Sequence, residues 1–286
     1  MKFTTSDGRK LSYRKIGRGP VLVCHPGGPG FSSSYFSDLA GLYEKFTLVM
    51  LNPRGTGASA RPADAHAYQI EDYVSDLEEL RQHLGLEMML LLGHSHGGVV
   101  AQAYAATHPG RVRRLVLAST LARFGPEQNA AMEAGVEKRS GQPWYQDAMA
   151  ALDEEQAGKF ANDQELGALF FREMPLYFAH FGPVEAGYLD TLRAESINGD
   201  TLKLFNQEVF TPSFSFDQRP LLSKITAPTL VITGEDDFIC GPLCSAEITA
   251  AVPGAREVIV GDSGHMVFIE QAQTFHDEVA DFLMEA

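Results

Sequence analysis

The sequence of 286 residues has few cysteines and no long hydrophobic run. Its three cysteines are an odd number, which does not suit a disulfide framework and indicates a reduced, cytoplasmic protein. Cys240 and Cys244 stand close together, but no further cysteine or histidine follows at ligand spacing, so the pair does not predict a metal site. The longest apolar runs are no longer than a strand, which argues against a transmembrane helix. The opening residues MKFTTSDGRK lack the apolar core of a signal peptide.

Basic residues are also scarce. Lys and Arg number 23 against 37 Asp and Glu, which gives a net charge of −14, and no run of basic residues offsets it. A negative field of this size repels nucleic acid and anionic membrane surfaces. We therefore expect neither nucleic acid nor a membrane among the partners of this protein. The sequence does not define an oligomeric state.

Short apolar segments alternate with helical patterns along most of the chain. Residues 70–84 place apolar side chains at helical spacing, whereas MMLLLG (88–93) is a continuous apolar run, typical of a strand buried on both faces of a parallel sheet. This alternation predicts the α/β class with a mostly parallel, doubly wound sheet, and the turn signal Asp7-Gly8 adds an antiparallel edge. Strands are expected at 2–5, 10–16, 21–24, 46–51, 88–93, 113–120, 227–234 and 256–261, and helices at 70–84, 97–108, 243–252 and 273–286.

Residues 121–222 interrupt this alternation. They contain about half of the aromatic residues in about a third of the length, and no β-rich part is evident among them. We expect a helical cap whose aromatic side chains face a core built from residues 1–120 and 223–286. A second helical core without a role in binding would explain the aromatic residues equally well.

The segment GHSHG (93–97) sets Ser95 between two histidines and two glycines. A nucleophilic serine on a sharp strand-to-helix turn needs small residues two positions before and after it, and Gly93 and Gly97 supply them. His94 and His96 could instead begin a dinuclear metal motif, but glycines stand where such a motif continues with an acid and a further histidine. We therefore interpret Ser95 as a nucleophile and expect no metal.

A serine nucleophile needs a histidine base and a carboxylate that orients the base. Asp237 follows the predicted strand 227–234 and is preferred to its neighbour Asp236, and His265 lies in a loop after the last strand. As structural alternatives, Asp237 would cap a helix and His265 would be a surface histidine. For the oxyanion we expect backbone N–H groups from Gly28, in the glycine-rich turn 24–30, and from His96.

At this point the chain resembles the α/β-hydrolase fold and, within it, the proline iminopeptidase family of serine aminopeptidases. The resemblance implies a triad of Ser95, Asp237 and His265 and an oxyanion role for Gly28, and the family's helical cap corresponds to 121–222. The segments that carry it are PGGPG (26–30), NPRGTGAS (52–59), GHSHGG (93–98), GEDD (234–237) and GHMVFIE (264–270).

The chain departs from the family pattern at the positions that hold a substrate's free amino group. Family members use glutamates for this purpose, one in the cap and one directly after the catalytic Asp. Glu208 lies near the first position, although an exposed helix residue is the plain alternative, and Phe238 occupies the second. Near the active site, Pro26 also replaces a histidine that the family usually has.

These observations lead to a serine hydrolase that forms an acyl-enzyme, without metal or organic cofactor, on a small-molecule or short-peptide substrate. An aminopeptidase that releases N-terminal proline is the first expectation, and a carboxylesterase or lactonase for small apolar acyl groups is the alternative. Carbon–carbon bond hydrolases share the triad and stay open. An inactive, receptor-like scaffold would have no need of Ser95, Asp237 and His265 in this order.

Overall fold

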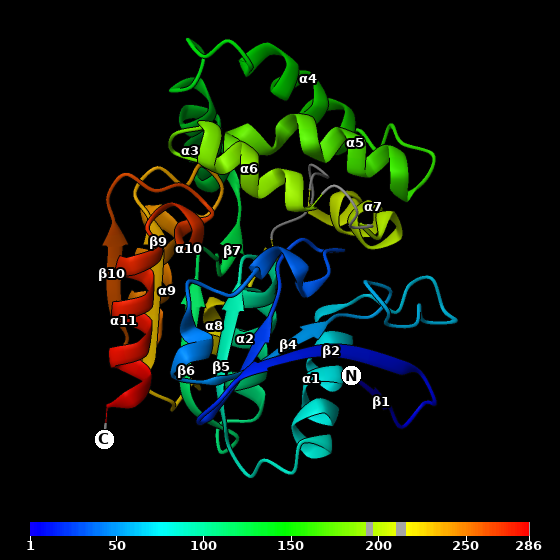
Figure 1. Ribbon diagram of the computed structural model, residues 1–286, viewed down its shortest axis with the longest axis vertical. Coiled ribbons are helices and arrows are strands. Elements are labelled where there is room, and N and C mark those ends of the chain that lie inside the picture. The colour runs from blue at the N-terminus through cyan, green and yellow to red at the C-terminus, as the bar shows by residue number, and fades with distance from the viewer. Residues whose placement is uncertain (193–196, 210–215, 286) are drawn as a thin grey trace.

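The computed structural model describes residues 1–192, 197–209 and 216–285, and only the backbone of 206–209. Eight strands form one sheet in the order β1-β2-β4-β3-β5-β6-β9-β10 (Figure 1). The pairs β1–β2 and β2–β4 are antiparallel and the other pairs are parallel, which confirms the predicted mostly parallel sheet with an antiparallel edge. The strands are β1 Lys2–Thr4, β2 Lys10–Gly17, β3 Val21–His25, β4 Thr47–Asn52, β5 Met89–His94, β6 Val112–Ala118, β9 Thr229–Gly234 and β10 Arg256–Val260.

Apolar side chains cover both faces of this sheet. Because successive strand residues point to opposite faces, Leu91 of β5 enters one core and Leu90 and Leu92 enter the other. Helices α1, α2, α8 and α9 pack in the first core, and α10, α11 and two 3-10 helices pack in the second, so the sheet is doubly wound as predicted. The bounds are α1 Ile70–His83, α2 His96–Thr107, α8 Arg219–Leu222, α9 Pro242–Ala251, α10 Val267–Glu270, α11 Ala272–Met284, η1 Ser33–Phe36 and η2 Leu42–Glu44.

Helices α3 to α7 lie together beyond one end of the sheet (Figure 1). With the 3-10 helix η3 they are called the cap below, and their presence agrees with the helical character predicted for this part of the chain. None of the helices within the described ranges is both long and apolar enough to cross a membrane. The cap elements are α3 Pro126–Glu137, α4 Tyr145–Gln156, α5 Asp163–Glu173, η3 Met174–Tyr177, α6 Pro183–Leu192 and α7 Gly199–Val209.

The segment 121–222 also contains β structure, which corrects the expectation of none. Strands β7 (Arg123–Phe124) and β8 (Phe216–Asp217) pair antiparallel, one near each end of the segment. Strands of two residues are too short to produce an alternating pattern in the sequence. The domain boundaries 120/121 and 222/223 stay a prediction.

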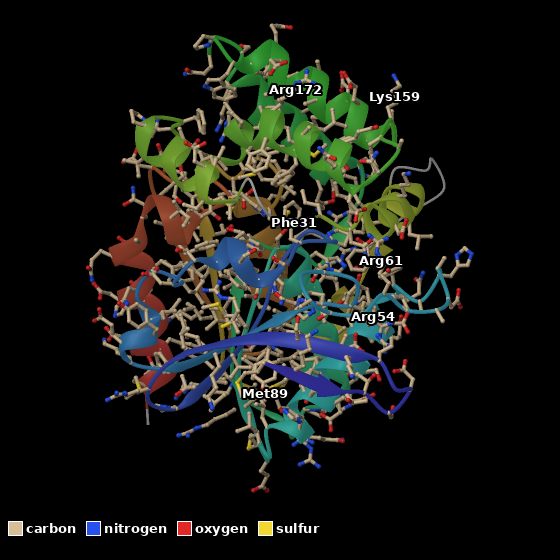
Figure 2. All side chains as sticks on the ribbon, turned by 45° about the vertical axis from the view of Figure 1, so that its right-hand side comes forward. Phe31, Arg54, Arg61, Met89, Lys159 and Arg172 are labelled. Atoms are coloured by element: carbon tan, nitrogen blue, oxygen red, sulfur yellow. The ribbon has the colours of Figure 1, made fainter. Side chains whose placement is uncertain are left out.

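Two side chains labelled in Figure 2 join the cap to the rest of the chain. Arg61, in the connection between β4 and α1, forms ion pairs with Asp163 of α5 and Asp200 of α7. Phe31, which follows β3, packs on Phe170 of α5 with ring centroids 4.4 Å apart. The cap is therefore held by both charged and aromatic contacts.

Candidate active site

Ser95 occupies the sharp turn between β5 and α2. Its backbone angles, φ 55° and ψ −126°, belong to a region that few residues other than glycine adopt. A Cβ atom on Gly93 would lie 2.3 Å from the carbonyl oxygen of Gly97, and one on Gly97 would lie 2.3 Å from the carbonyl oxygen of His25. Both glycines are thus required by close backbone approach, which is the reason the sequence pattern predicted this turn.

His265 and Asp237 form a buried hydrogen-bonded pair. Nδ1 of His265 lies 2.8 Å from Oδ2 of Asp237, and Oδ1 of Asp237 accepts the backbone N–H groups of Ile239 and Cys240 at 3.0 and 2.9 Å. Burial works to raise the pKa of Asp237, but the charge of His265 and these hydrogen bonds lower it below its usual value. Asp236 faces Lys138 instead, with 3.6 Å between its Oδ1 and the lysine Nζ. Asp237, and not Asp236, therefore forms the hydrogen bond to His265.

The backbone around His265 is fixed from several directions. Its N–H donates to the carbonyl oxygen of Tyr177 in the cap at 2.8 Å, and its carbonyl oxygen lies 3.0 Å from Nε2 of His94. The preceding residue, Gly264, donates its N–H to Glu270 at 2.7 Å, and the other oxygen of Glu270 accepts a backbone N–H from the cap. Burial raises the pKa of Glu270 to about 7. The loop that carries His265 is therefore tied to both the core and the cap.

The glycine-rich turn after β3 lies against the serine turn. A Cβ atom on Gly27 would lie only 2.7 Å from Cβ of Ser95, so glycine is needed for this approach. The N–H of Gly27 already donates to the hydroxyl of Tyr35 at 2.5 Å. The next N–H in the turn belongs to Gly28, and His96 is the first residue of α2, where a backbone N–H has no partner inside the helix. Gly28 and His96 thus remain the candidates for oxyanion donors.

The side chains of the two histidines beside Ser95 have other contacts among the described residues. Both ring nitrogens of His94 lie within hydrogen-bond distance of protein oxygens, and the ring of His96 packs against aromatic side chains. Cys240 and Cys244 are buried free thiols. In the described parts of the chain, no group of at least three His, Cys, Asp or Glu side chains is arranged to hold a metal ion.

Ser95 and His265 open into one cavity of about 220 Å³ that core and cap line together. Phe238 belongs to its wall and packs on the ring of Tyr177 with centroids 5.3 Å apart. Glu208 falls on α7, but its side chain lies outside the described residues. Most of the lining is apolar and includes Phe31, Phe170, Met174, Leu202, Phe205 and Phe238.

Two buried acids of the cap, which the sequence analysis missed, line the same cavity. Glu173, at the end of α5, is 1% exposed, and Glu155 of α4 is 6% exposed. Oε2 of Glu173 has no hydrogen-bond partner among the described residues. Burial and then the charge of Glu155 raise the pKa of Glu173 well above its usual value, against the effect of a hydrogen bond from Tyr177. The cavity therefore combines a candidate nucleophile with a carboxyl group in an apolar wall.

Comparisons with known proteins agree with this fold. A family model for the alpha/beta hydrolase fold matches residues 20–272. The proline iminopeptidase of Lactobacillus delbrueckii subsp. lactis is 28% identical to this chain, over 93% of this chain and 90% of that protein.

Solved structures with the same fold include a hydrolase from Pseudomonas aeruginosa PA01, which is 28% identical with a TM-score of 0.73 and covers 100% of this chain and 98% of its own. The enol-lactonase from Burkholderia xenovorans LB400 is 25% identical with a TM-score of 0.70, over 100% of both chains. The chain is thus similar both to a peptidase that acts on proline and to a lactone-cleaving enzyme.

Proposed function

Because the chain belongs to the alpha/beta hydrolase fold family, we propose that it is a serine hydrolase with Ser95, His265 and Asp237 as its catalytic triad. Nε2 of His265 accepts the proton of Ser95 Oγ while this oxygen attacks the carbonyl carbon of the substrate. Asp237 keeps the proton of the imidazole on Nδ1 and stabilises the imidazolium that forms. Ser95 and His265 need to come within hydrogen-bond reach for this transfer, a contact that often tightens only when substrate is bound.

The rest of the cycle follows from the same groups. The N–H groups of Gly28 and His96 stabilise the oxyanion of the tetrahedral intermediate. His265 then gives its proton to the leaving amine or alcohol, which departs and leaves an acyl ester on Ser95. A water molecule, deprotonated by His265, attacks this ester and releases the acid. This chemistry needs no metal and no organic cofactor.

For the substrate we propose an N-terminal residue with a free amino group, proline first, so that the enzyme is an aminopeptidase. The observation that carries this proposal is the buried carboxyl of Glu173 in the wall of the cavity that Ser95 and His265 also line. A buried carboxylate such as that of Glu173 is costly unless hydrogen bonds or a positively charged group stabilise it. An ammonium group supplies this charge, and Glu155 adds to the attraction.

Replacement of Glu173 with glutamine tests the proposal. Only substrates with a free amine should lose a charge-assisted contact, so kcat/KM for prolyl p-nitroanilide should fall by about 10- to 100-fold, or roughly 1.5–3 kcal/mol. Hydrolysis of p-nitrophenyl acetate, which has no amine, should stay within about twofold of the wild type. The ratio of the two rates reports the amine contact and cancels a general loss of folded enzyme.

The matched control is Glu133→Gln, which removes an exposed carboxylate from α3 of the same cap. It should leave both rates unchanged. Equal losses on both substrates in Glu173→Gln would contradict an amine site at Glu173. They would leave the serine hydrolase itself intact, since Ser95→Ala tests that part: it should abolish turnover of both substrates while the chain stays folded.

The second candidate is hydrolysis of esters or lactones with small apolar acyl groups. It is supported by the apolar cavity wall, by Phe238 directly after the proposed catalytic acid, and by the similarity to an enol-lactonase. If prolyl p-nitroanilide is not cleaved, a series of p-nitrophenyl esters of increasing chain length identifies this activity. We also propose the cytoplasm as the location, because the three cysteines are free.

A further inference from the structure

Tyr35 and His94 stand at a junction of the turns that surround the cavity. The hydroxyl of Tyr35 accepts the N–H of Gly27 at 2.5 Å and lies 2.8 Å from Nδ1 of His94. Nε2 of His94 lies 3.0 Å from the carbonyl oxygen of His265. A single chain of hydrogen bonds therefore runs from the glycine-rich turn to the loop of His265.

The donor and acceptor of each hydrogen bond in this network follow from the backbone groups of Gly27 and His265 at its two ends. A backbone N–H only donates, so the oxygen of Tyr35 accepts from Gly27 and its own O–H is free to donate to Nδ1 of His94. A backbone carbonyl only accepts, so Nε2 of His94 carries the proton that it donates to His265. Burial, and then the charge of His265, lower the pKa of His94 to about 3, so the ring stays in this neutral form.

Both side chains of this network are almost completely buried. His94 is 2% exposed and Tyr35 is 6% exposed. The ring of His94 packs against Phe268 with centroids 5.2 Å apart and against Phe36 at 6.2 Å. Both residues also belong to the cavity wall, and on their aromatic side no neighbouring group can replace a lost hydrogen bond.

We propose that Tyr35 and His94 are positioning residues that couple the oxyanion turn to the histidine base. Tyr35 fixes the turn at Gly27, one residue before the donor Gly28, and His94 fixes the backbone of His265. The two parts must be aligned at the same moment, since the oxyanion forms as the base takes the proton. The inference rests on the proposed triad, but not on whether the substrate is an amide or an ester.

The first test is Tyr35→Phe, which keeps the ring and removes the hydroxyl. Using p-nitrophenyl acetate, kcat should fall by about 10- to 100-fold while KM stays within about threefold, because positioning acts mainly on the transition state. The affinity for phenylboronic acid, which forms a tetrahedral adduct with an active serine, should fall in parallel with kcat/KM. A residue that serves only stability would change the melting temperature and leave both quantities per folded molecule unchanged.

The chain offers a matched control in Tyr13→Phe. Tyr13 is also buried, and its hydroxyl lies 3.3 Å from Nε2 of His83, so the substitution breaks a partly buried tyrosine–histidine contact that does not line the cavity. We expect this variant to keep wild-type kcat and boronate affinity. Comparison of the two variants separates loss of a tyrosine–histidine hydrogen bond from loss of this particular one.

The second test removes the hydrogen bonds of His94, the other side chain of this network. His94→Phe keeps a ring in the aromatic pocket but removes both nitrogens. If the two residues act as one hydrogen-bond network, the double variant of His94→Phe and Tyr35→Phe should lose about as much kcat as the more affected single variant. If the effects instead multiply, Tyr35 and His94 act separately and the proposed coupling is wrong. Should Tyr35→Phe fail to fold, kcat and boronate affinity of His94→Phe decide in the same way.

Failure of this inference can be told apart from failure of the proposed function. If a fluorophosphonate probe does not label Ser95 in the wild type, the triad itself is wrong. If Ser95 is labelled and Tyr35→Phe behaves like Tyr13→Phe, the triad stands and the positioning role is overturned. Labelling of Ser95 that is about 10- to 100-fold slower in Tyr35→Phe, with the control unchanged, supports both.

Discussion

Replacement of Asp237 with asparagine is a sharp test of the triad because the structure dictates how the new amide must be oriented. Oδ1 of Asp237 accepts two backbone N–H groups, whereas Oδ2 accepts only Nδ1 of His265. The amide oxygen of asparagine will therefore keep the first position, since a flip would leave two buried N–H groups unsatisfied at about 1–3 kcal/mol each. The amide NH₂ group then faces His265.

An NH₂ group only donates, so Nδ1 of His265 must become the acceptor and the ring proton must move to Nε2. In this tautomer Nε2 cannot accept the proton of Ser95. We expect kcat for p-nitrophenyl acetate to fall by about 10⁴-fold, or roughly 5 kcal/mol of activation free energy, as for the same change in other Ser-His-Asp triads. KM should change by less than about threefold, because Asp237 acts through His265 and not on the substrate.

The neighbouring acid provides the control. Asp236→Asn removes a charge that is partly exposed and faces Lys138, so its rate should equal that of the wild type. Circular dichroism and thermal melting will establish that both variants are folded. If Asp237→Asn keeps more than about a tenth of the wild-type kcat, the tautomer argument is refuted. If Asp236→Asn loses the activity instead, the wrong acid has been assigned.

Two further predictions concern stability. Burial raises the pKa of Glu270 from 4.5 to about 7, so the folded state favours the protonated carboxyl group. The contribution of this group to the free energy of unfolding is therefore fully present below pH 4.5 and is lost as the pH rises through 7. In urea unfolding, the stability of the wild type relative to Glu270→Gln should fall by roughly 3 kcal/mol across this window, and a flat difference would contradict it. Gly97→Ala, whose Cβ would lie 2.3 Å from the carbonyl oxygen of His25, should destabilise the chain by about 2–3 kcal/mol. Gly110→Ala, with open space around it, should melt near the wild-type temperature, and equal melting of both variants would show that the turn tolerates a side chain.

The sheet and the serine turn could be predicted because both produce recognisable sequence patterns. A strand buried on both faces is a continuous apolar run, and a turn with close backbone approach requires glycine. Residues 88–93 are apolar without interruption, and Gly93 and Gly97 mark a place where only glycine fits. The ends of elements were less predictable. The strand expected at 113–120 ends at Ala118, because Ser119 has a φ of 44°, which no strand residue adopts and no sequence pattern announces.

Contacts between distant turns could not be predicted at all. Tyr35 and His94 are 59 positions apart in the chain, and nothing in the local sequence of either indicates that their side chains meet. His94 was considered only as a possible metal ligand, because its spacing from His96 is visible in the sequence. A buried network of this kind is determined by the three-dimensional packing of η1 against the end of β5.

The cap acids left a signal of a different kind, which a search for charged residues on apolar faces would have found. In both α4 and α5 the buried positions recur at helical spacing, and the last of them is a glutamate: Ala148, Ala151, Leu152 and Glu155 in α4, and Leu166, Gly167, Leu169 and Glu173 in α5. A carboxyl group in such a position opposes folding, since burial disfavours its charge. One acid of this kind is ambiguous, because a hydrogen bond inside the cap would be enough to account for it. Both glutamates also line the cavity of Ser95, and titratable groups buried in a cavity wall are candidates for ligand contacts. Glu208 was preferred in the sequence because of its position relative to the family pattern, whereas burial would have directed attention to Glu155 and Glu173.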